Sequence, residues 1–101
     1  MKAPDVITLI NAIRRSYVHA ETVYTMGGCY QFHLILKAVF PKAVPIYQSP
    51  GHVVTELDGK LYDITGEVLA EPTQIKLEDE PRILVEAQNW YFDWGLMPGA
   101  E

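Results

Sequence analysis

The sequence predicts one α+β domain that spans residues 1–101. Three observations support this fold class. Apolar residues follow helical spacing near the N-terminus, a strongly apolar helical segment follows Gly27-Gly28, and two β-rich runs flank Asp58-Gly59. Helices that come before a small antiparallel sheet are typical of α+β proteins, in which helices and strands are segregated along the chain.

The first predicted element is a helix over residues 4–18. Pro4 and Asp5 suit a first helical turn. The apolar residues that follow with helical spacing are Val6, Leu9, Ile10, Ile13 and Tyr17. Residues 19–28 are mixed in composition and end in two glycines, so we expect a loop there.

The second predicted helix covers residues 29–40 and begins at Cys29. Its apolar side chains lie nearly all round the helix, which is typical of a buried helix. They are Phe32, Leu34, Ile35, Leu36, Ala38, Val39 and Phe40. Pro41 ends this helix because proline lacks an N–H and clashes with the preceding turn.

The strands are expected in the second half of the chain. Residues 44–48 predict an edge strand because they include a proline, and residues 49–51 predict a turn. Residues 52–57 and 60–65 predict a tight hairpin around Asp58-Gly59.

The last third of the sequence predicts shorter elements. We expect a loop over residues 66–72, a strand over 75–77, and a helix that starts at 79–81 and continues to Trp90. The aromatic residues near the C-terminus are expected to pack back onto the sheet, before a frayed end over 95–101. They are Trp90, Tyr91, Phe92 and Trp94.

The composition argues against several classes of function. The chain carries 8 basic and 13 acidic residues, for a net charge of −5, and its basic residues are scattered, so we do not expect nucleic-acid binding. Its apolar runs are too short to span a bilayer and its N-terminus lacks a signal-peptide pattern, so we expect no membrane attachment and, with a single cysteine, a cytoplasmic protein. The single cysteine, Cys29, excludes an internal disulfide and fits a reducing compartment.

The predicted turn determines which hairpin side chains meet. If Asp58-Gly59 is a two-residue turn, Leu57 faces Lys60, and His52 and Asp63 are diagonal neighbours on one face. Their Cβ atoms then lie roughly 7–8 Å apart or less, within reach of a hydrogen bond between the side chains. We expect the helix that begins at Cys29 to cover this face and to bring the thiol to the pair.

Cys29, His52 and Asp63 together predict nucleophilic catalysis. A helix N-terminus and a histidinium partner both favour the thiolate form of a cysteine. His52 would activate the thiol, and Asp63 would orient the imidazole ring. The N–H of Cys29 is a candidate oxyanion donor, Tyr24 is a candidate second donor, and Gly28 would let a substrate carbonyl approach closely.

The sequence resembles the papain-like superfamily, in particular its transglutaminase-like and cell-wall amidopeptidase branches. The resemblance lies in residues 27–34, in the strand that starts at His52 and in the next strand, which carries Asp63. The resemblance covers about residues 20–68 and assigns the roles of nucleophile, base and orienting residue to Cys29, His52 and Asp63. It implies hydrolysis or acyl transfer at an amide or peptide carbonyl through a thioacyl intermediate, on a peptide or protein substrate and without a cofactor. Small bacterial and phage proteins share this pattern.

Other interpretations stay open. The domain could be a catalytically silent papain-like protein, phage-encoded, that binds a host protein, and a lone cysteine is often a buried core residue. Cys29, His33, His52 and Asp63 could instead ligate zinc, although a ligand set with one thiolate is sparse. Exposed aromatic residues near the C-terminus would favour a homodimer.

Overall fold

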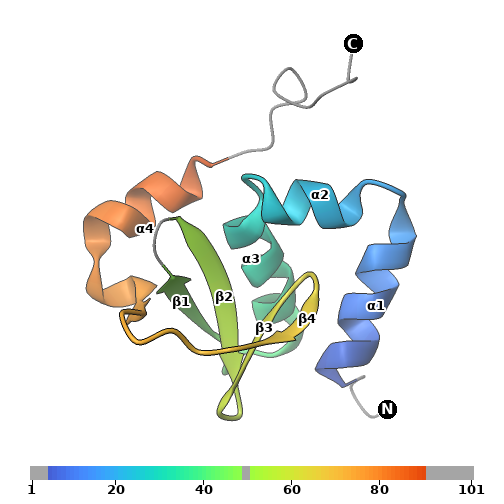
Figure 1. Cartoon of the computed structure of the whole chain (residues 1–101), viewed down its shortest axis with the longest axis horizontal. Coiled ribbons are helices and arrows are strands. Elements are labelled where there is room, and N and C mark those ends of the chain that lie inside the picture. Colours follow the sequence, from blue (N-terminus) through green and yellow to red (C-terminus); the bar gives the residue numbers. More distant parts are fainter. Residues whose placement is uncertain (1–4, 49–50, 91–101) are drawn as a thin grey trace.

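The computed structural model describes residues 5–48 and 51–90 and has an α+β fold (Figure 1). Its elements are, in chain order, α1 (Val6–Ser16), α2 (Ala20–Thr25), α3 (Cys29–Val39), β1 (Val44–Gln48), β2 (His52–Leu57), β3 (Lys60–Asp63), β4 (Gly66–Val68), β5 (Ile75–Lys76), the 3-10 helix η1 (Leu77–Asp79) and α4 (Pro81–Gln88). The strands form one antiparallel sheet in the order β4-β3-β2-β1-β5. The predicted fold class is confirmed.

The predicted N-terminal helix is present as α1, with shorter ends. Asp5 caps it, because the Asp5 carboxylate accepts a hydrogen bond of 2.8 Å from the N–H of Thr8. Val6 and Ile10 are the residues of α1 that are buried, so the apolar stripe faces the core as its spacing predicted.

The predicted loop over residues 19–28 is wrong in its central part, where α2 forms. Six residues are too few to show helical periodicity in the sequence, and this helix is stabilised by packing rather than by its own propensity. Ala20 is fully buried, and the ring of Tyr24 packs on Phe32 with a centroid distance of 5.5 Å.

Helix α3 begins at Cys29, as predicted, directly after Gly28. A side chain at Gly28 would not fit, because a Cβ atom there would lie 2.7 Å from the carbonyl oxygen of Val23. The prediction that α3 is buried all round is only partly correct, since Leu34 and Val39 are 45% and 37% exposed. Within the described residues, neither α3 nor any other helix is long and apolar enough to cross a membrane.

The sheet differs from the prediction at both of its edges. Strand β1 is not an edge strand, because β5 pairs with Ile46 and Tyr47 on its far side. This pairing does not include Pro45, so a proline is tolerated inside the sheet. The predicted loop over 66–72 begins with β4, which pairs with β3 and forms the opposite edge.

The hairpin has the predicted register. Leu57 pairs with Lys60, and both turn residues have positive φ, 53° at Asp58 and 81° at Gly59. This backbone is the one that a two-residue hairpin turn requires. The hairpin therefore places His52 and Asp63 at the same end of the sheet.

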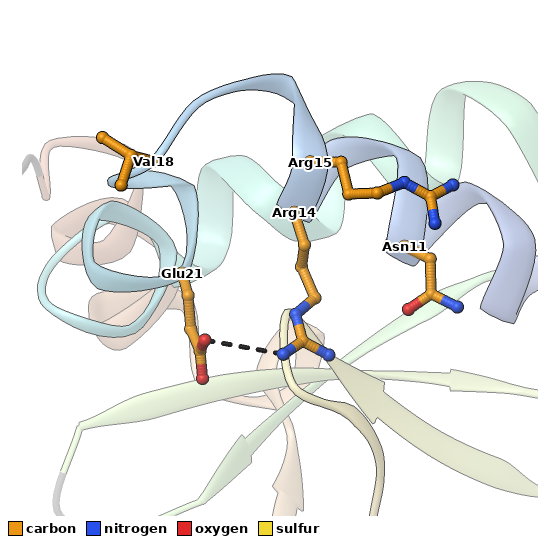
Figure 2. Close-up of a pocket in the computed structure, with 5 residues that line it drawn as sticks. All are labelled: Asn11, Arg14, Arg15, Val18 and Glu21. Atoms are coloured by element: carbon orange, nitrogen blue, oxygen red, sulfur yellow. Dashed lines mark ion pairs between the residues drawn. The ribbon is translucent and has the colours of Figure 1, made fainter.

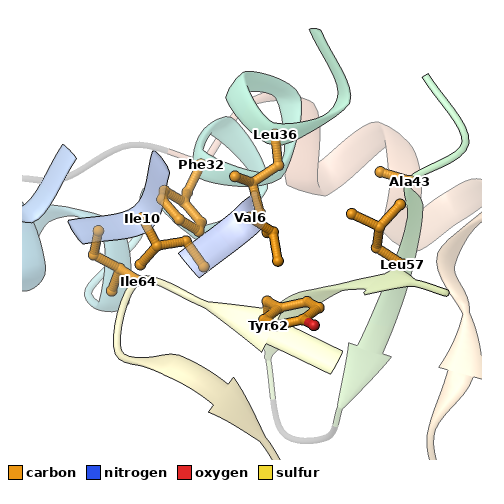
Figure 3. Packing of buried hydrophobic residues seen from close by; sticks show 8 residues of the cluster. All are labelled: Val6, Ile10, Phe32, Leu36, Ala43, Leu57, Tyr62 and Ile64. Carbon is orange, nitrogen blue, oxygen red and sulfur yellow. The ribbon is translucent and has the colours of Figure 1, made fainter. Parts of the chain in front are cut away.

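The main core lies between the helices and one face of the sheet (Figure 3). Its buried members are Val6, Ile10, Phe32, Leu36, Ala43, Leu57, Tyr62 and Ile64. Helix α3 therefore covers the face that carries Leu57 and Tyr62, and the prediction that it covers the His52 face is wrong. The large side chains at these positions offer α3 more apolar surface to bury than the His52 face does.

A loop covers the other face of the sheet. The link between β4 and β5 joins opposite edges and has to cross the strands between them, as Figure 1 shows. Gln48 fixes this link, because its side-chain nitrogen donates hydrogen bonds of 3.1 Å to the carbonyl oxygen of Leu69 and to Gln74. Beneath it lies a second small apolar cluster centred on Ile46, Val54 and Leu61.

Candidate active site

His52 and Asp63 form the centre of the site. His52 opens β2 and Asp63 ends β3, and because these strands are antiparallel neighbours, both residues lie at one end of the sheet. The His52 Nε2 atom lies 2.9 Å from Asp63 Oδ2. The structure thus brings together the pair that the hairpin register predicted.

Asp63 is held rigidly by the residues that follow it. Its Oδ1 atom accepts hydrogen bonds from the backbone N–H of Thr65, at 2.7 Å, and from the Thr65 hydroxyl, so that Oδ2 is directed at His52. Burial works to raise the pKa of Asp63, but the hydrogen bonds from His52 and Thr65 outweigh it and hold the pKa below the usual 3.8. Asp63 is therefore a fixed carboxylate at neutral pH.

His52 has the opposite shift. Hydrogen bonds to Asp63 and then to the Cys29 thiol, opposed by partial burial, raise the pKa of His52 from 6.5 to about 9. Its side chain is 30% exposed, so the ring is in contact with solvent on one side. At neutral pH His52 is an imidazolium held by the Asp63 carboxylate, and the Cys29 side chain helps to keep it protonated.

Cys29 approaches His52 from the helix layer. It is the first residue of α3, and its sulfur accepts a hydrogen bond of 3.4 Å from the backbone N–H of Val53. Because Nε2 of His52 is bonded to Asp63, Nδ1 is the ring nitrogen that remains for the thiol. The first N–H of α3 that bonds back along the chain is that of Phe32, which donates to the carbonyl oxygen of Gly28. The N–H groups before it are the ones that the start of a helix leaves without an intrahelical partner, and Cys29 lies in this turn.

Residues of α4 and η1 cover the thiol. Cys29 is only 3% exposed and belongs to a cluster with Tyr30, Val53, Leu77 and Ala87, against which Trp90 packs. Gln31 connects the residues just after α4 to the first turn of α3, because its Nε2 atom donates a hydrogen bond of 2.9 Å to the carbonyl oxygen of Trp90. Sequence reasoning missed Gln31, although it is a polar residue two positions after the cysteine in a strongly apolar helix.

A comparison with known families identifies the chain. Residues 6–95 match the family described as Phage YunG-like protein. The chain belongs to this family. The match runs from α1 to beyond α4 and includes Cys29, His52 and Asp63, in agreement with the expectation of a small phage-type protein. Searches of curated proteins and of solved structures find no match.

The structure shows packing roles for the two weaker site candidates. Gly28 is required by the close approach of Val23, and Tyr24 belongs to the main core through its contact with Phe32. A part for Tyr24 or Gly28 in oxyanion binding stays a prediction. The remaining aromatic candidates Tyr91, Phe92 and Trp94 lie outside the described residues.

His33 does not join the site as a metal ligand. Its Nδ1 atom bonds the Thr55 hydroxyl at 2.8 Å on the face of the sheet that α3 covers. Burial, and to a lesser extent the charge of Lys37, lowers the pKa of His33 to about 4, so its ring is neutral. Over residues 5–48 and 51–90, no three His, Cys, Asp or Glu side chains gather as a metal site would require.

A separate pocket of about 270 Å³ lies at α1 and α2 (Figure 2). It is lined by Asn11, Arg14, Arg15, Val18 and Glu21. Arg14 points toward Glu21 at 3.6 Å, whereas Arg15 points away from it (Figure 2). Both arginines lie in the last turn of α1, where a positive charge stabilises the helix end. None of these residues belongs to an element that carries Cys29, His52 or Asp63.

Proposed function

We propose that the protein is a cysteine-dependent hydrolase or acyltransferase that acts on an amide or peptide carbonyl. The observation that carries this proposal is the position of His52, which hydrogen bonds to Asp63 at 2.9 Å and interacts with the thiol at the start of α3. A cysteine that opens a helix, a histidine at a strand start and a carboxylate on the next strand also support the papain-like relationship inferred from the sequence.

The first chemical step is acylation of Cys29. The sulfur attacks the carbonyl carbon, a C–S bond forms, and the thiol proton resides on His52. The oxygen of the tetrahedral intermediate carries the negative charge, which the N–H groups in the first turn of α3 are placed to stabilise. His52 then donates its proton to the leaving nitrogen, the C–N bond breaks, and a thioester remains on Cys29.

The second step depends on the acceptor. Water or an amine attacks the thioester carbonyl, His52 takes up the proton of the attacking group, and the C–S bond breaks as the thiol is restored. Asp63 keeps the imidazole in position through both steps and remains ionised. Water gives hydrolysis or deamidation, and an amine gives acyl transfer.

Alkylation by iodoacetamide tests this proposal. We expect Cys29 to alkylate at neutral pH at least about 10-fold faster in the wild type than in His52→Ala, because the histidinium favours the thiolate. Lys60→Ala, an exposed change on the same hairpin, is the matched control and should keep the wild-type rate. Equal rates in the wild type and His52→Ala would refute the proposed role of His52.

A second candidate function has one observation in its favour. Cys29 is 3% exposed, as expected of an ordinary core cysteine in a catalytically silent protein that binds a host protein. In that case Cys29→Ser keeps the full biological effect, whereas surface substitutions on the hairpin abolish it. If the protein is an enzyme, Cys29→Ser abolishes the effect and leaves the fold intact.

A further inference from the structure

We propose that the side-chain amide of Gln31 binds the main chain of a peptide substrate beside Cys29, in the position that the carbonyl of Trp90 occupies in the structure. This assignment rests on the proposed function and names its substrate class as polypeptide. It also means that the Trp90 carbonyl, just after α4, occupies the place of a substrate carbonyl while no peptide is bound.

The first observation is the bond between Gln31 and Trp90. Gln31 lies in the first turn of α3, two residues after Cys29, and its Nε2 atom donates to the main-chain oxygen of Trp90 at 2.9 Å. The partners are 59 residues apart in the sequence, so this bond is a tertiary contact rather than a local cap. A side-chain amide in the same helical turn as the nucleophile is thus already bonded to a peptide carbonyl.

The second observation is the other half of the same amide. The Oε1 atom of Gln31 is buried and has no hydrogen-bond partner among the described residues. A primary amide offers both donors and an acceptor, and a buried acceptor without a donor is unfavourable. A peptide strand presents a C=O and an N–H, so it can satisfy Nε2 and Oε1 together, whereas the Trp90 carbonyl satisfies only Nε2.

The third observation is the burial of the nucleophile. A substrate carbonyl must come within about 3–3.5 Å of the sulfur, yet Cys29 is 3% exposed, within a buried cluster against which Trp90 packs. Val53 lies in the interior strand β2 and cannot move aside without breaking the sheet. In the proposed binding event a substrate peptide displaces the Trp90 carbonyl and exposes the sulfur. The N–H of the same peptide donates to Oε1 of Gln31.

Two matched electrophiles test this inference. The probes are acetyl-Ala-Ala chloromethyl ketone and its analogue with both amide nitrogens methylated, which keeps the carbonyls but removes the N–H donors. In each reaction the sulfur bonds the methylene carbon and chloride leaves, while the thiol proton resides on His52, as in the acylation step. We expect the wild type to react about 5-fold faster with the unmethylated probe, the effect of one hydrogen bond.

Variants of Gln31 test whether the preference for the unmethylated probe comes from the Oε1 atom of Gln31. Gln31→Met has a similar shape without hydrogen-bonding groups and should lose the preference, whereas Gln31→Glu retains the acceptor and should keep it. Gln88→Met, at an exposed position of α4, is the matched control and should behave as the wild type. A wild type without preference overturns the inference whether or not Gln31→Met folds, and so does an unchanged preference in Gln31→Met.

Alkylation by iodoacetamide tests the role of His52 separately from the role of Gln31, because iodoacetamide has no peptide main chain. If His52→Ala slows alkylation but the methylated and unmethylated probes react equally, only the role of Gln31 fails. If alkylation is independent of His52, the proposed function itself fails.

Discussion

Replacement of Asp63 by asparagine should lower the pKa of His52 by a measurable amount. The bond at 2.9 Å to Asp63 is the largest cause of a rise from 6.5 to about 9. At about 1.4 kcal/mol per pKa unit, the whole rise corresponds to roughly 3 kcal/mol in favour of the charged ring. Because the His52 side chain is 30% exposed, solvent screens part of this energy, and we expect Asp63→Asn to cost about 1–3 kcal/mol of folding free energy near neutral pH.

The sign of the effect follows from the direction of each shift. The raised pKa of His52 stabilises the fold fully below about pH 6.5, and this contribution is lost as the pH rises through about 9. The lowered pKa of Asp63 stabilises the fold above about pH 3.8, and this contribution is lost as the pH falls through its folded value. The difference between wild type and Asp63→Asn should therefore be largest between these limits.

Proton NMR of the histidine rings measures the first effect, and urea denaturation across the same pH range measures the second. The His52 resonance, assigned by its loss in His52→Ala, should titrate near pH 9 in the wild type and close to 7 or below in Asp63→Asn. His33, with a pKa of about 4, should not change and serves as the internal control. A wild-type midpoint near 6.5, or the same midpoint in both proteins, would refute the electrostatic account.

Two further substitutions test the packing around the site. Gly28→Ala should destabilise the fold by about 1–3 kcal/mol in urea denaturation, because its Cβ atom would lie 2.7 Å from the carbonyl oxygen of Val23; an unchanged midpoint would contradict this close approach. Thr55→Val should cost about 1–3 kcal/mol, because it leaves the buried ring nitrogen of His33 unpaired, while Thr55→Ser keeps the hydroxyl and should retain most of the stability. Equal losses in both Thr55 variants would show that the methyl group, not the hydrogen bond, matters.

Local features of the fold were predictable from the sequence because neighbouring residues determine them. The Asp58-Gly59 turn fixes its own backbone and hence the register that brings His52 and Asp63 together. The start of α3 at Cys29 follows from Gly28 before it and the apolar run after it.

Features that depend on distant parts of the chain were not predictable. Helix α2 is too short to show a period, and β4 forms because β3 offers it an edge. The face of the sheet that α3 covers depends on which side buries more apolar surface, and the other side is covered by a link whose path no local pattern encodes. The contact between Gln31 and Trp90 joins residues 59 positions apart, so only the folded chain reveals it.

The central claim is that His52 activates Cys29, and the pH profile of Cys29 alkylation by iodoacetamide tests it most directly. We expect the wild type to react at least about 10-fold faster than His52→Ala at neutral pH. The two profiles should converge above about pH 9, where His52 loses the proton that Asp63 and the thiol retain on it. Profiles that coincide over the whole range would contradict the claim.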